Sequence, residues 1–304
     1  MTISHVLKKY HTVEIDLLLS HILGKPREFL YMNGGNRLTR MQTNRLTRMV
    51  RRRLKGEPIA YILGYKDFYG LRFKVDRRVL IPRPETEELV DLAIASASEA
   101  IFTKDRRVGQ VKPWPPRDDR KFKILDLGTG SGCVAISITK GIGYRVKEME
   151  IFATDKSPAA LAVAKQNAKT ILGKNSNTSE YWSFSRINFI HSDLFKNIRG
   201  KFDLVVANLP YVPLADYRLK IKDLRYEPQM ALVDPKKDFD LYERFFKELA
   251  FPKILNRKSL IYFEIDPKAK PFIAKWVKKY LPQGKVKFYK DFNYLWRYAE
   301  IKST

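Results

Sequence analysis

The sequence has few residues that build metal sites or disulfide frameworks. Cys133 is the only cysteine among 304 residues, and the four histidines are scattered along the chain. A thiolate cluster for a metal and a set of disulfide bonds are therefore both excluded. Because no second ligand type lies near the histidines, we expect no metal cofactor.

Long apolar runs are also missing. No run approaches the roughly 20 residues that cross a bilayer. Acidic Glu14 and Asp16 lie beside the first apolar stretch, and no small-residue cleavage pattern follows it. These features argue against a signal peptide. We expect a soluble, cytoplasmic protein with no membrane contact.

Acidic residues are scarce relative to basic ones. Lys and Arg number 58 against 33 Asp and Glu, which gives a net charge of +25. Such an excess favours an anionic partner, which would be RNA, an RNA-bound protein or an acidic protein surface. A uniformly Lys-rich surface gives the same total, so composition alone leaves both interpretations open.

The length and the 44% hydrophobic content predict a folded chain of more than one domain. Residues 1–56 are predicted to form a helical domain. Within it, residues 36–49 repeat Asn-Arg-Leu-Thr-Arg-Met and lead into three consecutive arginines. This basic helix is either a solvated helix face or an RNA contact. Residues 57–82 are predicted as a connector that contains a β-hairpin between Ile59 and Ile81.

Residues 83–304 alternate helices with strands. A helix is predicted from Pro84 to about Phe102, followed by an exposed loop over 103–121. Strands are then expected at Lys123–Leu127, Ile151–Thr154, Ile187–His191, Leu204–Ala207 and Leu260–Ile265. Helices are expected at Cys133–Lys140, Pro158–Leu172 and Phe239–Leu249. This order is typical of a doubly wound, mostly parallel α/β sheet of Rossmann-like type. Two further strands, at Lys285–Tyr289 and Trp296–Ile301, are expected to pair as an antiparallel edge.

A glycine turn joins the first of these strands to its helix. Its residues are Gly128, Thr129, Gly130, Ser131 and Gly132. Glycines let the backbone approach a ligand closely, and a helix start offers free N–H groups. The spacing differs from the Gly-x-Gly-x-x-Gly of pyrophosphate binders. Asp126, just before the turn, would repel a pyrophosphate but suits a ligand that carries an amine and a sulfonium.

Two more carboxylates follow the next two strands. Asp155 suits the hydroxyl groups of a ribose, and Asp193, followed by Leu194, suits a purine ring beside an apolar surface. Each of these carboxylates, taken alone, is equally well explained as a structural cap. Three acidic strand ends in register with a glycine turn favour S-adenosylmethionine (SAM) over a nicotinamide cofactor.

The apolar strand Leu204–Ala207 runs directly into Asn208, Leu209, Pro210 and Tyr211. The Asn208 side-chain oxygen and the Leu209 carbonyl are uncharged acceptors that suit a planar NH2 group. Tyr211 offers a flat face for stacking, and Pro210 restricts the backbone. Alone, the same pattern is also a strand-to-loop turn with a capping Asn.

Together these residues resemble the protein-(glutamine-N5) methyltransferases that modify peptide chain release factors, the PrmC/HemK family. The similarity covers nearly the whole chain. Its specific marks are Gly56-Glu57-Pro58, Ala60–Gly64, Phe68-Tyr69-Gly70, Ile81–Glu87, Asp126–Gly132, Ser192–Phe195, Asn208–Tyr211, Glu227-Pro228, Ala231-Leu232 and Glu264-Ile265.

The resemblance implies methyl transfer from SAM to the glutamine of a release factor's Gly-Gly-Gln motif. It implies that the glycine turn, Asp155 and Leu194 line the cofactor site, that Asn208 touches both ligands, and that Asn208–Tyr211 hold the glutamine. Arg83 and Glu85 are also expected at the substrate site, and the helical domain is expected to grip the release factor. Two positions depart from the family pattern: Leu209 replaces a proline, and Asp266 replaces a glycine.

Two other functions remain open on the sequence. An N6-adenine or guanine-N2 nucleic-acid methyltransferase would present a similar NH2 group to the same corner, and the positive charge fits it. A protein that binds SAM or RNA without catalysis is the second alternative, with Leu209 as a sign of decay.

Overall fold

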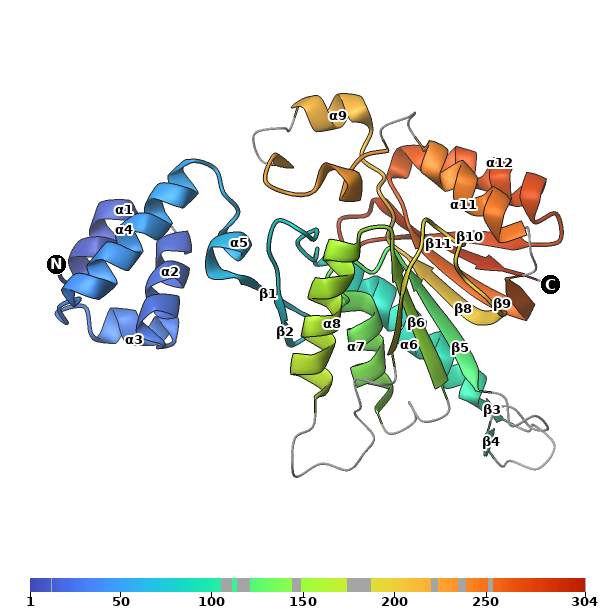
Figure 1. The fold of residues 1–304 in the computed structure, drawn as a ribbon, viewed down its shortest axis with the longest axis horizontal. Coiled ribbons are helices and arrows are strands. Elements are labelled where there is room, and N and C mark those ends of the chain that lie inside the picture. Colours follow the sequence, from blue (N-terminus) through green and yellow to red (C-terminus); the bar gives the residue numbers. More distant parts are fainter. Residues whose placement is uncertain are drawn as a thin grey trace.

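The computed structural model describes residues 1–11, 13–104, 111–113, 121–143, 149–173, 187–219, 224–234, 239–250 and 254–303. Its elements fall into a helical N-terminal part, a small hairpin and a large sheet flanked by helices (Figure 1). No helix in these ranges has the length and apolar character needed to cross a membrane. Nor do these ranges bring three or more His, Cys, Asp or Glu together as metal ligands.

The predicted helical N-terminal segment is confirmed. It contains α1 (Ile3–Tyr10), α2 (Val13–Leu23), α3 (Arg27–Met32) and α4 (Arg40–Leu54). Helix α4 starts with a capping box, in which Thr39 and Gln42 each bond the other's backbone N–H. One face of α4 buries Leu46, Met49 and Val50 in a core of their own. The basic side chains are therefore left on the opposite face.

The prediction of a hairpin from Ile59 onward is wrong at its start. Residues Ile59–Leu63 form the short helix α5. Pro58 precedes it and Gly64 ends it at φ 83°, a conformation that glycine adopts freely. Ile62 packs into the N-terminal core. A five-residue apolar run fits a strand or a helix equally well by pattern, and the flanking Pro and Gly decided the outcome.

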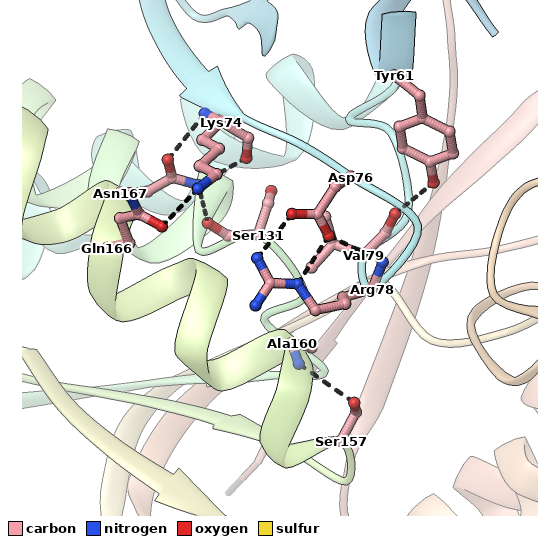
Figure 2. Close-up of polar contacts among 10 residues, drawn as sticks. All are labelled: Tyr61, Lys74, Asp76, Arg78, Val79, Ser131, Ser157, Ala160, Gln166 and Asn167. Atoms are coloured by element: carbon pink, nitrogen blue, oxygen red, sulfur yellow. Dashed lines mark hydrogen bonds and ion pairs between the residues drawn. The ribbon is translucent and has the colours of Figure 1, made fainter. Parts of the chain in front are cut away.

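The hairpin itself follows α5 and packs on the sheet domain. Strands β1 (Tyr65–Phe68) and β2 (Leu71–Lys74) pair antiparallel. The buried Asn167 side chain, from helix α8 (Pro158–Leu172), accepts from the Lys74 N–H at 2.8 Å and donates to the Lys74 carbonyl at 3.0 Å. It also donates to the Ser131 carbonyl at 2.8 Å, so one amide joins the connector to the glycine turn (Figure 2).

The predicted doubly wound sheet is confirmed, with its antiparallel edge. The strand order is β10-β11-β9-β8-β5-β6-β7. Strands β9, β8, β5, β6 and β7 are parallel, and β11 lies antiparallel between β9 and β10. The bounds are β5 Phe122–Leu127, β6 Met149–Asp155, β7 Ile187–His191, β8 Phe202–Ala207, β9 Leu255–Glu264, β10 Lys285–Lys290 and β11 Trp296–Lys302.

Helices cover both faces of this sheet (Figure 1). On one face pack α6 (Glu85–Ile101), α7 (Cys133–Ile142) and α8 (Pro158–Leu172). On the other pack α11 (Asp240–Ala250) and α12 (Lys270–Tyr280), the second of which was not predicted. Strand β8 is buried along its whole length, as expected for a central strand.

The segment predicted as an exposed loop over 103–121 contains some strand structure. Residues Phe102–Lys104 (β3) and Val111–Pro113 (β4) pair antiparallel. The rest of that prediction, over 105–110 and 114–120, lies outside the described residues. Beyond β8, a short helix α9 (Leu214–Leu219) and a 3-10 turn η3 (Gln229–Ala231) follow, and neither was predicted.

Candidate functional site

The carboxyl ends of β5, β6, β7 and β8 bring most of the predicted residues to one edge of the sheet. Leu127 pairs with Thr154 on one side and with Ala207 on the other. A pocket opens at this edge, lined by the strand ends and by the loops that follow them. The predicted residues that line it are Gly128, Gly130, Asp155, Asp193, Leu194, Asn208, Leu209 and Pro210.

A second, smaller cavity shares Leu80, Gly128, Gly130 and Asn208 with this pocket. It is lined by four more predicted residues, Arg83, Asp126, Thr129 and Ser131. The two cavities therefore adjoin at the glycine turn and at Asn208. Among the predicted site residues, Gly132, Tyr211 and Glu85 line neither cavity.

The glycine turn lies directly against the Asn208 corner. Gly128 has φ 79°, and a Cβ atom there would lie 3.1 Å from Leu209 Cδ2 and 3.6 Å from the Asn208 carbonyl oxygen. Leu209 is only 5% exposed, so its side chain fills the space between the two loops. The leucine that departs from the family pattern is therefore a packed residue whose main-chain carbonyl is retained.

Asp126 is buried beneath the turn. Its Oδ2 accepts hydrogen bonds from Thr129 Oγ1 at 2.7 Å and from the Ala135 N–H at 3.1 Å. Burial raises the pKa of this carboxyl to about 7, which these two bonds only partly oppose. A cationic group in the smaller cavity would favour its ionised form.

Asp155 ends β6 and holds two loops in place. Its Oδ2 accepts from the Gly130 N–H at 2.9 Å, and its Oδ1 accepts from the Ser157 N–H at 2.8 Å. Burial raises the pKa of this carboxyl as well. Each carboxylate oxygen has capacity for a further donor, so the side chain remains suited to ribose hydroxyls.

Asp193 is placed differently from the other two carboxylates. Its oxygens lie 3.4 Å from Lys156 Nζ and 3.3 Å from Arg244 Nη2. Leu194 beside it is buried with φ 49°, a left-handed conformation that a leucine rarely adopts. This strained turn presents the Leu194 side chain to the pocket next to the carboxylate.

Asn208 has one defined amide orientation. Its Nδ2 donates to Thr86 Oγ1 and to Glu264 Oε2, both at 2.9 Å. Because Nδ2 carries two hydrogens, both are used, and Oδ1 accepts no hydrogen bond from the described residues. The Leu209 carbonyl likewise accepts none from those residues. Two uncharged acceptors are thus available beside the pocket.

Glu264 was noted in the sequence only as a family position. It is fully buried at the end of β9, where it also accepts from Thr86 Oγ1 at 2.8 Å and from the Tyr211 hydroxyl at 2.9 Å. Burial raises the pKa of Glu264. Tyr211 therefore anchors the corner through its hydroxyl. No sequence pattern indicated that Thr86, Asn208 and Tyr211 would converge on one carboxylate.

Arg83 and Glu85 stand at the start of α6. Arg83 Nη2 lies 2.5 Å from Glu227 Oε1, and Glu227 Oε2 accepts from the Ile81 N–H at 3.1 Å. The Glu85 carbonyl accepts from the Tyr298 hydroxyl at 2.6 Å. The segment that carries both residues is thereby fixed beside the smaller cavity, which Arg83 lines.

One wall of the main pocket was missed by the sequence analysis. Arg78, Val79 and Leu80 line it from the connector, and Pro228, Met230 and Ala231 line it from the segment around η3. Figure 2 shows how the connector part is held, with Asp76 paired to Arg78 and the Tyr61 hydroxyl donating to the Val79 carbonyl at 2.6 Å. Pro228 and Ala231 were noted in the sequence only as family positions, and no sequence pattern placed any of these residues at the pocket.

The arrangement suits a nucleoside ligand that carries positive charge. The glycine turn permits close approach, Asp155 suits a ribose, and buried Asp126 has no cationic partner among the described residues. A pyrophosphate would meet carboxylates at each of these points. The fold and this pocket define a SAM-dependent methyltransferase.

Comparisons with known proteins narrow this class. A family model described as the PrmC N-terminal domain matches residues 5–64, and one described as the methyltransferase small domain matches residues 115–223. The release factor glutamine methyltransferase of Bacillus cereus is 34% identical over 91% of this chain and 88% of its own length. That of Chlorobaculum tepidum is 34% identical over 82% of this chain and 76% of its own length. The chain belongs to the release factor glutamine methyltransferase family.

Among solved structures, the hMettl16 catalytic domain in complex with the MAT2A 3′UTR hairpin 6 is similar, with a TM-score of 0.51. The match covers 87% of this chain and 82% of that chain, at 13% sequence identity. At that identity the similarity concerns the fold alone.

Proposed function

We propose that this chain transfers a methyl group from SAM to the side-chain amide nitrogen of the glutamine in the Gly-Gly-Gln motif of class 1 release factors. The observation that carries the proposal is the fixed amide of Asn208, whose Oδ1 is left as an acceptor beside the pocket. Family membership supports the substrate. A release factor acts on ribosomes, so we place the reaction in the cytoplasm.

The binding of the cofactor is assigned to the two adjoining cavities. We assign the nucleoside part to Asp155, Asp193, Leu194 and the Gly128–Gly132 turn, and the cationic amino acid part to the smaller cavity above Asp126. SAM supplies a methyl group that is electrophilic because it is bound to a positively charged sulfur.

An amide nitrogen is a weak nucleophile because its lone pair is delocalised into the carbonyl group. Asn208 Oδ1 and the Leu209 carbonyl would accept the two N–H hydrogens of the substrate glutamine and favour a pyramidal nitrogen. A new N–C bond forms as the S–C bond breaks, and the nitrogen then loses one proton to solvent. Catalysis in this scheme comes from position and electrostatics.

We propose that three parts of the chain have different roles. Residues 1–56 recognise the release factor, 57–82 form the connector, and 83–304 carry out methyl transfer. Arg83 and Glu85 border the substrate glutamine, supported by the position of Arg83 in the smaller cavity together with Asn208.

The decisive experiment is mass spectrometry of a release factor that is co-expressed with this protein. The Gly-Gly-Gln peptide should gain one methyl group on its glutamine. The variant Asn208→Ala should lose most of this transfer, on the order of 100-fold in kcat, because a positioned hydrogen-bonding group has been removed. It should still bind SAM in part. Labelling of duplex DNA or ribosomal RNA in place of the release factor would contradict the proposal.

We also propose that the basic face of α4 contacts RNA. Its outward side chains are exposed and cationic: Arg40, Arg45, Arg48, Arg51, Arg52 and Lys55. Of these, Arg45 bonds His21 and Arg52 pairs with Glu57. Binding to structured RNA should weaken steeply with salt. A double charge reversal, Arg48→Glu with Arg51→Glu, should abolish it, whereas Lys285→Glu with Lys287→Glu on distant β10 should not. Equal effects of the two reversals would contradict a specific role for α4.

A further inference from the structure

Glu264 closes a buried network that connects three elements at the acceptor corner. Strands β8 and β9 are neighbours, with Ala207 paired to Phe263, so the next residues, Asn208 and Glu264, lie side by side at the strand ends. Thr86, the second residue of α6, reaches the same carboxylate. The three side chains thus come from parts of the chain that are 56 or more residues apart.

The network fixes the direction of each of its hydrogen bonds. Burial favours the protonated form of Glu264, but hydrogen bonds from Thr86 and Tyr211 and the charge of Arg297 act against that effect on its pKa and favour the carboxylate. An ionised carboxylate accepts and cannot donate, so the Thr86 and Tyr211 hydroxyls and the Asn208 amide all donate to Glu264. Thr86 uses its one hydrogen on Glu264 and therefore accepts from Asn208. The reversed amide of Asn208 would bring an oxygen against two acceptors. Only one orientation of Asn208 is compatible with this arrangement.

We infer that Glu264 is the positioning residue of the methyl-transfer site: it forces Asn208 Oδ1, rather than its NH2 group, toward the substrate amide. The inference rests on the proposed function, because a reversed Asn208 would present a donor to the glutamine NH2 group. Glu264 lines neither cavity and acts through the side chains that donate to it, those of Thr86, Asn208 and Tyr211. Its substitution should therefore lower kcat without a matching loss of SAM affinity.

The first test is Glu264→Gln, which keeps the shape but offers one acceptor and one donor. Asn208 then loses its single orientation, and kcat should fall about tenfold or more, as expected for loss of a charge-assisted hydrogen bond. The Kd for SAM and the melting temperature should stay near those of the wild type. Glu300→Gln is the matched control, since Glu300 is also buried and bonded by two tyrosine hydroxyls, those of Tyr262 and Tyr289. Its kcat should be unchanged.

The second test exchanges donor and acceptor across the pair. In Asn208→Asp alone, two carboxylates face each other, and activity should be very low. In the double variant Asn208→Asp with Glu264→Gln, the amide introduced on β9 can donate to one oxygen of the carboxylate introduced after β8, which leaves the other oxygen as an acceptor toward the substrate. The double variant should be at least about tenfold more active than Asn208→Asp.

The outcomes separate this inference from the proposed function. Failure of the wild type to methylate a release factor would overturn the proposed function. A wild type that is active, together with an unimpaired Glu264→Gln or a double variant no better than Asn208→Asp, would overturn the positioning role alone. A Glu264→Gln variant that loses stability and SAM affinity in parallel with kcat would also overturn it, because Glu264 would then be a general structural residue.

Discussion

Asp126 is a buried carboxyl group with no cationic side chain among its described partners. Its pKa is raised to about 7 by burial, well above the usual value of an exposed aspartate. The folded protein therefore holds this proton more tightly than the unfolded chain. The contribution of Asp126 to the free energy of unfolding should fall as the pH rises from about 4 to about 7.

The same shift predicts a pH dependence of cofactor binding. A cationic ligand favours the ionised carboxylate, so binding below pH 7 must first release a proton. The Kd for SAM, measured by titration calorimetry, should rise about tenfold between pH 7.5 and pH 6. Asp126→Asn should bind more weakly at pH 7.5 and lose the slope. A variant that keeps the full slope would show that another group titrates.

Leu209 lies at a position where the family has a proline. The sequence alone does not show how this replacement affects the corner. Its side chain packs against Gly128, and its carbonyl remains without a donor among the described residues. The packed side chain restrains this position by contact, where a proline would do so through its ring. The corner therefore keeps its acceptor with a different means of holding it.

At the scale of elements, Gly132 sets how closely α7 approaches α8. A Cβ atom at Gly132 would lie 2.9 Å from Ile136 Cδ1 and 3.1 Å from Ala164 Cβ, and its φ is 82°. Gly132→Ala should lower the free energy of unfolding by about 2 kcal/mol or more, since strain and contact add. Urea denaturation measures this.

Gly70→Ala provides the control for strain alone. Gly70 has φ 68°, and a Cβ atom added there would meet no other atom within 4 Å. Its cost should be about 1 kcal/mol, the strain of a left-handed alanine. If the two variants lost equal amounts of unfolding free energy, a Cβ atom at residue 132 would cost only backbone strain. The close contact between α7 and α8 would then not require a glycine there.

The elements that carry the acceptor corner were predictable because their signals are local. An apolar run, a glycine turn or a strand-ending carboxylate is visible within about ten residues, so β5, β6, β8 and the Asn208 corner followed from the sequence. The roles of Thr86 and Glu264 were not visible, because they depend on two strand ends and a helix start meeting in space. Helix α5 was misread because a short apolar run has no decisive period.

At the scale of the whole molecule, the connector is part of the wall of the main pocket. Arg78, Val79 and Leu80 form a wall of the main pocket, and the preceding α5 packs into the N-terminal core. The segment that would bind the release factor is therefore joined to the pocket by a short, folded stretch of chain. The position of this stretch depends on Asn167, which bonds both Lys74 and Ser131 (Figure 2).

Asn167→Ala should therefore disturb stability and cofactor binding together. It leaves the Lys74 N–H and carbonyl and the Ser131 carbonyl without their partner, at a cost of about 2 to 3 kcal/mol in unfolding free energy. Because Ser131 belongs to the glycine turn, the Kd for SAM should rise as well.

Gln166→Ala is the matched control, since the side chain of the neighbouring Gln166 bonds only the exposed Lys74 Nζ, at 2.9 Å. Such an exposed contact contributes little, so its loss should leave both quantities nearly unchanged. If the two variants behaved alike in urea denaturation and SAM titration, the connector would be independent of the glycine turn.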